Sequence, residues 1–475
     1  RAIEIYDYAR RDDGTVPMNY PTRGLQESVT YSMCQVMMYA DYVRYHDNLT
    51  WLKARIPGMR QTLDGIARFE NAEGLLVDLP GWSFSDWVRE WKLGIAPDGA
   101  GTVPNAFNNL YWVMTLNGAA AVERALGEPE RALIWERKAK RTMAAVERQF
   151  WDERRGLFAD TVRHDKFSEH AQCLAILSGA LPRERCKRLF ETMLAADDLA
   201  RCTVYFSYYL FETYFAFGRG DLFLQRLDLW RNYVSRDFKT PLEAPDGGKN
   251  GQKEARSDCH AWGSHPIVFM QRGLAGIDSA APFYRKVRVA PAPGSLRHLE
   301  ARSPHPRGFV AVELEFESGR ASGRVTLPDG VDGTFVWGDE EIPLHSGENP
   351  IQTARTVDVL VIGGTSEGVA AAAAASKRGA STLLVTPYAY LGEDLVGTLE
   401  LQISKSNGHP PLVQRLATDE QGMAEYDYWP DRTTPHPRAV FRNDRWERFS
   451  EPSPPKTPSD CVYYESDLNC RCVLR

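Results

Sequence analysis

Residues 105–150 read NAFNNLYWVMTLNGAAAVERALGEPERALIWERKAKRTMAAVERQF, and this stretch decides the fold. Apolar residues recur three and four positions apart on both sides of Gly127, which is the pattern of amphipathic helices. Pro104 and Asn105 open the first segment, and Pro129 opens the second. The stretch therefore predicts a helical hairpin, with helices over residues 105–126 and 128–150 and a turn at Gly127.

The same spacing extends over most of residues 1–273, which read as almost entirely helical. The other amphipathic segments are Ile3–Ala9, Glu27–His46, Trp51–Glu70, Phe167–Leu181, Arg183–Ala195, Thr203–Phe217, Asp221–Ser235 and His260–Leu274. Roughly ten helices joined by alternating short and long loops indicate a ring of helical hairpins or a solenoid. The sequence has no repeat of fixed length at about 30–45 residues, which argues against the solenoid.

A small antiparallel, sandwich-like β-domain is predicted for residues 279–347. Apolar and polar residues alternate there in short runs that are separated by Gly, Pro and Asp turns. The predicted strands are Arg285–Val289, Phe309–Phe316, Ala321–Leu327 and Thr334–Trp337, and Ser346–Gln352 reads as a linker. The helical domain before it is expected to end at residue 278.

Residues 348–400 change pattern again. A strand over 357–362, a glycine turn, a helix over 369–378 and a strand over 382–385 form one short Rossmann-like βαβ unit. Residues 401–475 are rich in Pro and charge and have little periodicity, so we expect an irregular tail. The predicted fold class is therefore mainly α, followed by a β-domain and the βαβ unit.

The composition excludes several classes of protein. The chain has 475 residues, of which 43% are hydrophobic and 25% charged, so a largely disordered chain is excluded. A net charge of -6 argues against a nucleic-acid-binding protein. No apolar run approaches the ~18 residues of a membrane span. Eight cysteines are too few for a disulfide scaffold, and Cys470-Arg471-Cys472 lacks a second ligand pair, so no metal site is expected.

The first residue, Arg1, lies inside a helix-like pattern and is preceded by no initiator Met or signal peptide. We therefore expect the chain to be a piece of something longer. The expected state is a soluble protein, cytoplasmic or periplasmic, and the sequence does not choose between these compartments.

Two constellations carry candidate chemistry. Gly81–Trp87 places aromatic side chains and a carboxylate in one long loop, where they could stack on a sugar or simply pack. Glu243 precedes the His/Trp-rich stretch Arg256–Pro266, where a general base could meet an imidazole. The alternative reading is a helix N-cap at Ser257 or Asp258, with a core histidine behind it.

These motifs resemble the catalytic region of α-L-rhamnosidases, the six-hairpin glycosidases of glycoside hydrolase family 78. The resemblance covers about residues 1–345, and the motifs that carry it are Trp82–Trp87, Ser168–Gln172, Arg256–Pro266, Arg285–Pro291 and Pro304–Gly308. It implies an (α/α)6 toroid without a cofactor, and inverting hydrolysis that removes terminal L-rhamnose from a glycoside or polysaccharide. It also implies Glu243 as the general base. The residues implied to bind the sugar are Trp82, Trp87, His170, His260 and Trp262, with Asp86 in the same wall as Trp82 and Trp87.

One departure from the family concerns the general acid. The acidic, tryptophan-containing motif that carries it in the family is absent from this chain, and Asp12-Asp13-Gly14 matches only the segment after it. We expect an incomplete toroid and impaired catalysis, with Asp86 as the carboxylate that could substitute for the acid. A noncatalytic carbohydrate-binding toroid is the alternative that this departure leaves open.

A second resemblance covers residues 355–400. The strand before Gly363-Gly364-Thr365 and the helix that begins near Gly368 are similar to the N-terminal segment of FAD-dependent oxidoreductases. The resemblance implies that Gly363, Gly364 and Gly368 approach the pyrophosphate of FAD, and Tyr388–Gly397 also matches. Thr386 stands where an acidic residue would hold the ribose. A fragment of an FAD-dependent oxidoreductase, fused to a glycosidase, is therefore a further alternative.

Overall fold

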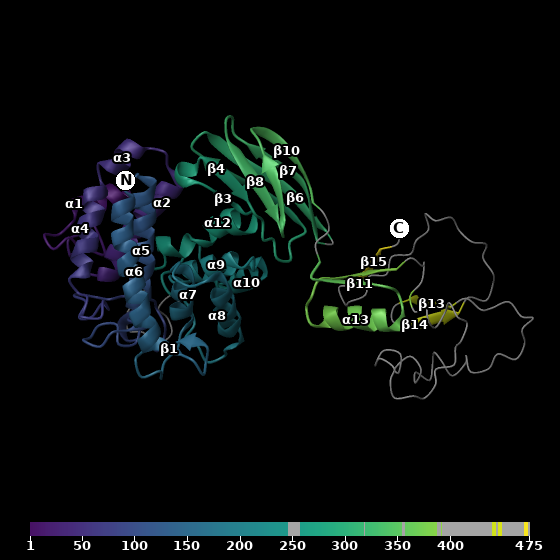
Figure 1. Cartoon of the computed structure of the whole chain (residues 1–475), viewed down its shortest axis with the longest axis horizontal. Coiled ribbons are helices and arrows are strands. Elements are labelled where there is room, and N and C mark those ends of the chain that lie inside the picture. The colour runs from purple at the N-terminus through teal and green to yellow at the C-terminus, as the bar shows by residue number, and fades with distance from the viewer. Residues whose placement is uncertain are drawn as a thin grey trace, which may run out of the picture. The chain divides into compact units, whose positions relative to one another are not determined.

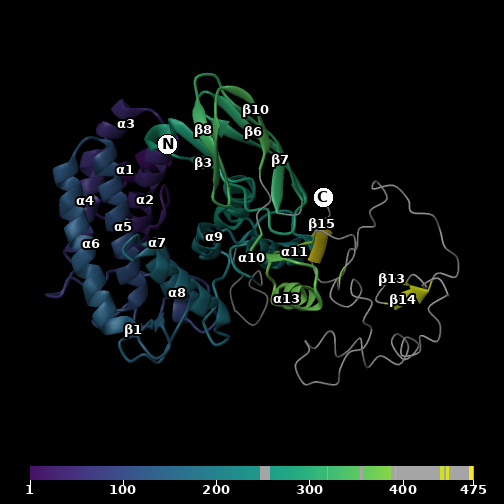
Figure 2. The same cartoon turned by 45° about the vertical axis from the view of Figure 1, so that its right-hand side comes forward.

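The helical hairpin predicted for residues 105–150 is present in the computed structural model as α5 (Ala106–Ala125) and α6 (Pro129–Phe150), which lie side by side in Figures 1 and 2. The Asn105 side chain caps α5 by accepting a hydrogen bond from Asn108 N at 3.1 Å. Gly127 has a φ of 81°, which glycine adopts without strain. Every residue from 106 to 116 is buried, because α5 is enclosed by α2, α6 and α7.

The structure describes residues 1–245, 257–317, 319–353, 357–386 and 391, together with the backbone of residues 439–442, 445–448 and 470–473. These residues belong to two units. The first comprises Arg1–Phe316 and Ala321–Thr353, and the second comprises Ala354–Arg475 and the turn Glu317–Arg320. Within the described ranges, no helix is both long enough and apolar enough to cross a membrane.

The first unit begins with helices at nearly all the predicted positions. Besides α5 and α6, they are α1 (Ala2–Tyr8), α2 (Val29–Tyr45), α3 (Leu49–Lys53), α4 (Ile56–Ala67), α7 (Glu169–Leu177), α8 (Arg183–Ala195), α9 (Ser207–Ala216), α10 (Gly220–Arg226), α11 (Asp228–Ser235) and α12 (Pro266–Phe269). Short 3-10 and π turns η1 (Lys92–Gly94), η2 (Ala261–Ser264) and η3 (Met270–Leu274), and a hairpin of β1 (Trp151–Asp152) and β2 (Leu157–Phe158), complete this part.

Three predicted helices are interrupted. The segment predicted over 221–235 divides into α10 and α11 at Leu227, and a proline accompanies each of the other two breaks. The segment predicted over 51–70 divides into α3 and α4, and Pro57 lies in the first turn of α4, where its missing N–H costs no hydrogen bond. The segment predicted over 260–274 consists of η2, α12 and η3, with Pro266 at the start of α12. In both places a proline allows a helix to begin but not to continue from the residues before it.

The remaining strands of the first unit form two four-stranded sheets. The orders are β3-β4-β8-β9 and β10-β7-β6-β5, and the strands are β3 (Ile277–Ser279), β4 (Lys286–Val289), β5 (His298–His305), β6 (Gly308–Glu317), β7 (Arg320–Leu327), β8 (Asp332–Trp337), β9 (Glu340–Leu344) and β10 (Gly347–Gln352); η4 (Pro282–Tyr284) lies between β3 and β4. The pairings of β10 with β7, β3 with β4, β5 with β6 and β8 with β9 are antiparallel, and β4 pairs with β8 in parallel.

The linker prediction for Ser346–Gln352 is wrong. Residues 347–352 form β10, which pairs with β7 over its full length, from Gly347 opposite Leu327 to Gln352 opposite Ser322. Ile351 is buried in the core, and this burial favours a strand despite the neighbouring glycine and proline.

The helices and the two sheets share one hydrophobic core. Polar contacts also join the helices to the sheets. The carboxylate of Asp278 in β3 accepts hydrogen bonds from Arg44 and from Tyr45 Oη, both in α2. At Gly220, which begins α10, a Cβ would lie 1.8 Å from the carbonyl oxygen of Ala292. Only glycine therefore permits this approach of the helix to the loop after β4.

The second unit contains β11 (Val359–Ile362), α13 (Ser366–Lys377) and β12 (Thr382–Val385), at the predicted positions. The two strands are parallel, and β12 also pairs in parallel with β15 (Cys470–Val473). A hairpin of β13 (Ala439–Arg442) and β14 (Arg445–Arg448) lies in the same part of the sequence as β15. Residues 401–475, expected to be irregular, thus contain these three short strands.

A pH-dependent stability difference follows from the packing of His265, next to α12. Burial among aromatic rings lowers the pKa of His265 to about 4, against the opposing effects of its hydrogen bond to Val204 O and the charge of Asp86. Between about pH 6.5 and pH 4, the unfolded chain binds a proton that the native state does not. The neutral ring therefore contributes about 3 kcal/mol to the free energy of unfolding. This contribution is complete above pH 6.5 and is lost as the pH falls through 4.

We therefore expect the destabilisation caused by His265→Gln to shrink between pH 7 and pH 4, as measured by urea unfolding. Asp160→Asn is the control of opposite sign, because burial raises the pKa of the Asp160 carboxyl to about 6. Its carboxyl group stabilises the native state most at low pH and loses that contribution as the pH rises through 6. A pH-independent effect of His265→Gln would contradict the prediction.

Candidate active site

A cavity of about 350 Å3 opens in the helical part of the first unit. Its lining combines aromatic rings with a few polar groups, and consists of Met18, Asn19, Gln26, Tyr31, Trp82, Phe84, Trp87, Glu243, His260 and Trp262. Three segments far apart in the sequence supply these residues: residues 18–31, the loop before η1, and residues 243–262. Among the lining residues that the structure describes, Glu243 is the only carboxylate.

Glu243 is held by donors on both of its oxygens. Oε1 accepts a hydrogen bond from Trp87 Nε1 at 3.1 Å, and Oε2 accepts one from Ser257 N at 3.0 Å. His260 Nδ1 lies 3.6 Å from Oε2, and the Glu243 side chain is 14% exposed. The arrangement orients a carboxylate toward a small cavity while leaving part of it accessible, as proton abstraction from a bound water requires.

The backbone around Glu243 fixes this position. Glu243 N donates to Ser257 O at 2.9 Å, and His260 N donates to Pro241 O at 2.9 Å, so the two segments run beside each other. Trp262 Nε1 donates to the carbonyl oxygen of Glu243 at 2.9 Å. The predicted grouping of Glu243, His260 and Trp262 is therefore present, whereas Arg256 of the same motif lies outside the described residues.

Aromatic rings form the rest of the wall. The rings of Phe84 and Trp262 are stacked with centroids 5.7 Å apart, and those of Trp82 and Trp87 lie 5.9 Å apart. Trp82 Nε1 donates to Leu93 O at 2.9 Å, which fixes the ring in the cavity wall. Such faces stack on the C–H faces of a sugar.

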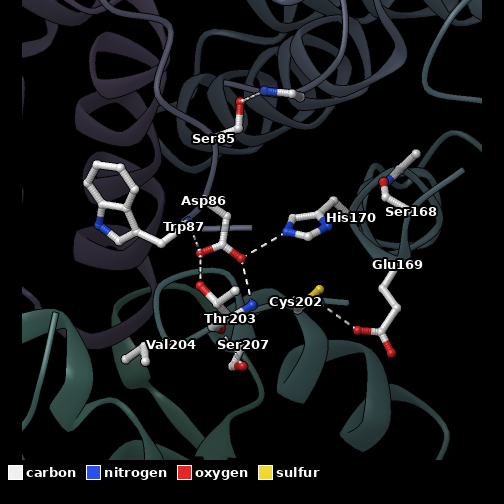
Figure 3. A network of polar contacts seen from close by, with 12 residues as sticks. Ser85, Asp86, Trp87, Ser168, Glu169, His170, Cys202, Thr203, Val204 and Ser207 are labelled. Atoms are coloured by element: carbon white, nitrogen blue, oxygen red, sulfur yellow. Dashed lines mark hydrogen bonds and ion pairs between the residues drawn. The ribbon is translucent and has the colours of Figure 1, made fainter. Parts of the chain in front are cut away.

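Asp86 and His170 do not line the cavity, although the sequence placed them with the site. Both side chains are fully buried, and His170 Nε2 lies 2.9 Å from Asp86 Oδ2. In Figure 3 the Trp87 indole and the His170 ring lie on opposite sides of the Asp86 carboxylate. The sequence motif is therefore split, with Trp87 facing the cavity and Asp86 behind it.

Sequence reasoning missed several lining residues. Tyr31 lies in α2 at a position that reads as ordinary helix, and Met18, Asn19 and Gln26 lie in the loop before it. Burial, together with the nearby Cys34, raises the pKa of Tyr31 well above its usual range. The Tyr31 hydroxyl is buried and has no hydrogen-bond partner among the described residues. No sequence signal distinguishes it from a core tyrosine.

The glycine turn of the second unit has part of the geometry of an FAD site. Gly363 has a φ of 113°, and a Cβ on Gly368 would lie 2.3 Å from Gly363 O, so the turn is tight enough for a phosphate to approach backbone. Thr365 occupies one helix amide, because its Oγ1 accepts from Gly368 N at 3.2 Å.

The ribose end of an FAD site fits less well. Thr386 is 4% exposed and lies against Gly364, so the end of β12 offers no carboxylate for ribose hydroxyls. The matching segment Tyr388–Gly397 lies outside the described residues except for Leu391. The described residues also contain no group of three or more His, Cys, Asp or Glu that could hold a metal ion.

Comparisons with known families agree with this organisation. The family model described as the bacterial α-L-rhamnosidase six-hairpin glycosidase domain matches residues 3–274, and that of the bacterial α-L-rhamnosidase C-terminal domain matches residues 276–349. A third, FAD dependent oxidoreductase, matches residues 358–439. No curated protein matched the chain.

Several solved structures share the fold of the first unit. A GH78 family rhamnosidase of Bacillus sp. GL1 has a TM-score of 0.63 at 22% identity, over 71% of this chain and 36% of its own. The α-L-rhamnosidase of Aspergillus terreus has a TM-score of 0.62 at 16% identity, over 74% of this chain and 42% of its own. The α-L-rhamnosidase of Streptomyces avermitilis, complexed with L-rhamnose, has a TM-score of 0.58 at 17% identity, over 74% of this chain and 36% of its own.

This chain thus spans 36–42% of the length of these solved proteins. The family models divide it where the structure passes from helices to sheets, between η3 and β3. With more than half of its residues matched by the first model, the chain belongs to the bacterial α-L-rhamnosidase six-hairpin glycosidase family.

Proposed function

We propose that this chain is a glycoside hydrolase that acts on terminal L-rhamnose in glycosides or polysaccharides, with Glu243 as its general base. The observation that carries the proposal is the Glu243 carboxylate, oriented by Trp87 and Ser257 at the wall of an aromatic cavity. The family membership and the fold shared with an α-L-rhamnosidase complexed with L-rhamnose support the choice of sugar.

The proposed reaction is inverting hydrolysis. Glu243 would take a proton from a water molecule as that water attacks the anomeric carbon, and a second carboxyl group would protonate the leaving oxygen. In such enzymes the two carboxyl groups are about 6.5–9.5 Å apart, which leaves room for the water. Trp82 and Trp262 would stack on the sugar, and His260 would contact a hydroxyl beside the base.

The described residues of the cavity wall supply no second carboxyl group as proton donor. Glu243 is the only carboxylate among the described lining residues, and Asp86 is buried behind the wall with its oxygens occupied by hydrogen bonds. Asp86 is therefore poorly placed to protonate a leaving group. We infer that catalysis by these 475 residues is limited by departure of the aglycone.

We expect the leaving group of the substrate to decide the rate. An aryl α-L-rhamnoside with an activated leaving group needs little protonation, so we expect detectable hydrolysis of 4-nitrophenyl α-L-rhamnopyranoside. A natural rhamnoside should react far more slowly, because its alkoxide leaves poorly without an acid. Release of rhamnose from both substrates, measured in parallel, checks this expectation. Turnover of the natural rhamnoside at the rate of the aryl one would refute the impairment.

The role of Glu243 is checked in the same assay. Glu243→Gln keeps the shape but removes the base, so kcat/KM for the aryl rhamnoside should fall by about 10²–10⁴-fold. Glu300→Gln, an exposed carboxylate of β5, is the matched control and should leave kcat/KM unchanged. Equal activity of Glu243→Gln and the parent protein would exclude Glu243 as the base.

A noncatalytic carbohydrate-binding role is the second candidate, and a cavity wall whose described residues include a single carboxylate favours it. Calorimetric titration with L-rhamnose distinguishes the two. Binding that is weakened at least tenfold by Trp262→Leu, without hydrolysis of even the aryl substrate, would favour the binding protein. The stacked position of Trp262 on Phe84 leads us to expect the loss of affinity in either case. Ile267→Ala, an exposed apolar residue of α12, is the control.

An FAD-dependent function of the second unit is the remaining alternative, and the match over residues 358–439 motivates it. Because the end of β12 offers the buried Thr386 in place of a carboxylate, we expect no stable flavin complex. The protein should show no flavin absorbance after incubation with FAD and gel filtration. A yellow complex that is lost in Gly363→Val would show that the glycine turn holds the cofactor.

A further inference from the structure

The buried carboxylate of Asp86 joins three segments of the helical domain (Figure 3). It accepts hydrogen bonds from Trp87 N at 2.9 Å, from Thr203 N at 2.6 Å and from Thr203 Oγ1, and His170 Nε2 lies 2.9 Å away. The partners belong to the loop before η1, to the segment before α9, and to the first turn of α7. A charge at 0% exposure is retained only where such donors compensate its lost hydration.

Trp87 connects this network to the cavity. Its backbone N–H is bound by Asp86, and its indole N–H donates to Glu243 Oε1 at 3.1 Å. The backbone and the side chain of one residue thus connect the buried carboxylate to the exposed one. Displacement of the Trp87 backbone would move the donor that orients Glu243.

The network is anchored on its far side as well. His170 packs against Trp91 and Phe206, with ring centroids 4.5 Å away in each case. Thr203 accepts a hydrogen bond at its carbonyl oxygen from Ser207 Oγ, in the first turn of α9. Asp86 is therefore fixed to packed helices, and this rigidity is what a positioning group needs.

We propose that Asp86, held by His170 and Thr203, is a positioning residue that orients the general base Glu243 through Trp87. The inference rests on the proposed function for the role of Glu243, but the contact itself is measurable without turnover. It assigns Asp86 and His170 a part in the site that requires no contact with the sugar.

A neighbouring carboxylate provides a matched control. Glu169 is 3% exposed, begins α7 and accepts a hydrogen bond from Cys202 N at 2.7 Å, one residue before the amide that Asp86 binds. Its ion-pair partners are Arg201 and Arg226 rather than the pair of Asp86 and His170. Glu169→Gln should therefore disturb a comparable buried network without affecting the base.

The test is ultraviolet resonance Raman spectroscopy, whose indole bands respond to hydrogen bonding at N–H. The Trp87 spectrum is isolated by subtracting the Trp87→Phe form of each protein. We expect the bands to report a bound N–H in the parent protein and in Glu169→Gln, and a weakened or lost hydrogen bond in Asp86→Asn. Unchanged Trp87 bands in Asp86→Asn would overturn the proposal.

Turnover of the aryl rhamnoside supplies a second readout. Asp86→Asn should lower kcat by about tenfold or more with KM nearly unchanged, and should cause little further loss in the Trp87→Phe background. Additive losses would contradict action through Trp87. If Asp86→Asn fails to fold, Thr203→Val removes one donor from Asp86 and should weaken the same Raman signal. A parent protein without turnover refutes the proposed function alone, because the Raman result stands apart from it.

Discussion

Carboxylates that lie among aromatic rings must have their hydrogen-bonding capacity met, and this requirement organises the whole site. Asp86 and Glu243 satisfy it with donors from segments that are distant in sequence, such as Trp87 and Glu243, 156 positions apart. The loop before η1, the start of α7, the segment before α9 and residues 241–245 and 257–262 therefore hold one another in place. The cavity is a consequence of this mutual constraint.

Much of the fold could be predicted from local sequence signals. The α5–α6 hairpin is marked by Asn105, Gly127 and Pro129, and each of these acts through its own backbone geometry or cap. Strand β10 could not be predicted, because its glycine and proline disfavour a strand and only the register with β7 and the burial of Ile351 decide it. The breaks before α4 and α12 required weighing prolines against a continuous apolar pattern.

Most residues of the site could be predicted, but not which of them line the cavity and which lie behind its wall. Five of the expected residues meet at one cavity, namely Trp82, Trp87, Glu243, His260 and Trp262. The separation of Asp86 from Trp87 was not predictable, because a motif does not say which of two neighbouring side chains faces the interior of a loop. Tyr31 was missed for a related reason, since a helical position lining a cavity looks the same in sequence as one lining a core.

The close approach at Gly220 bears on how the family's modules can be exchanged. The helical and C-terminal domain models meet between residues 274 and 276, yet the core runs through that point and the backbone of α10 touches the Ala292 carbonyl. A β-domain transplanted from a relative would have to bring a loop that matches this glycine, and a partner for Arg44 and Tyr45. The boundary between the two family models thus does not coincide with a break in the packing.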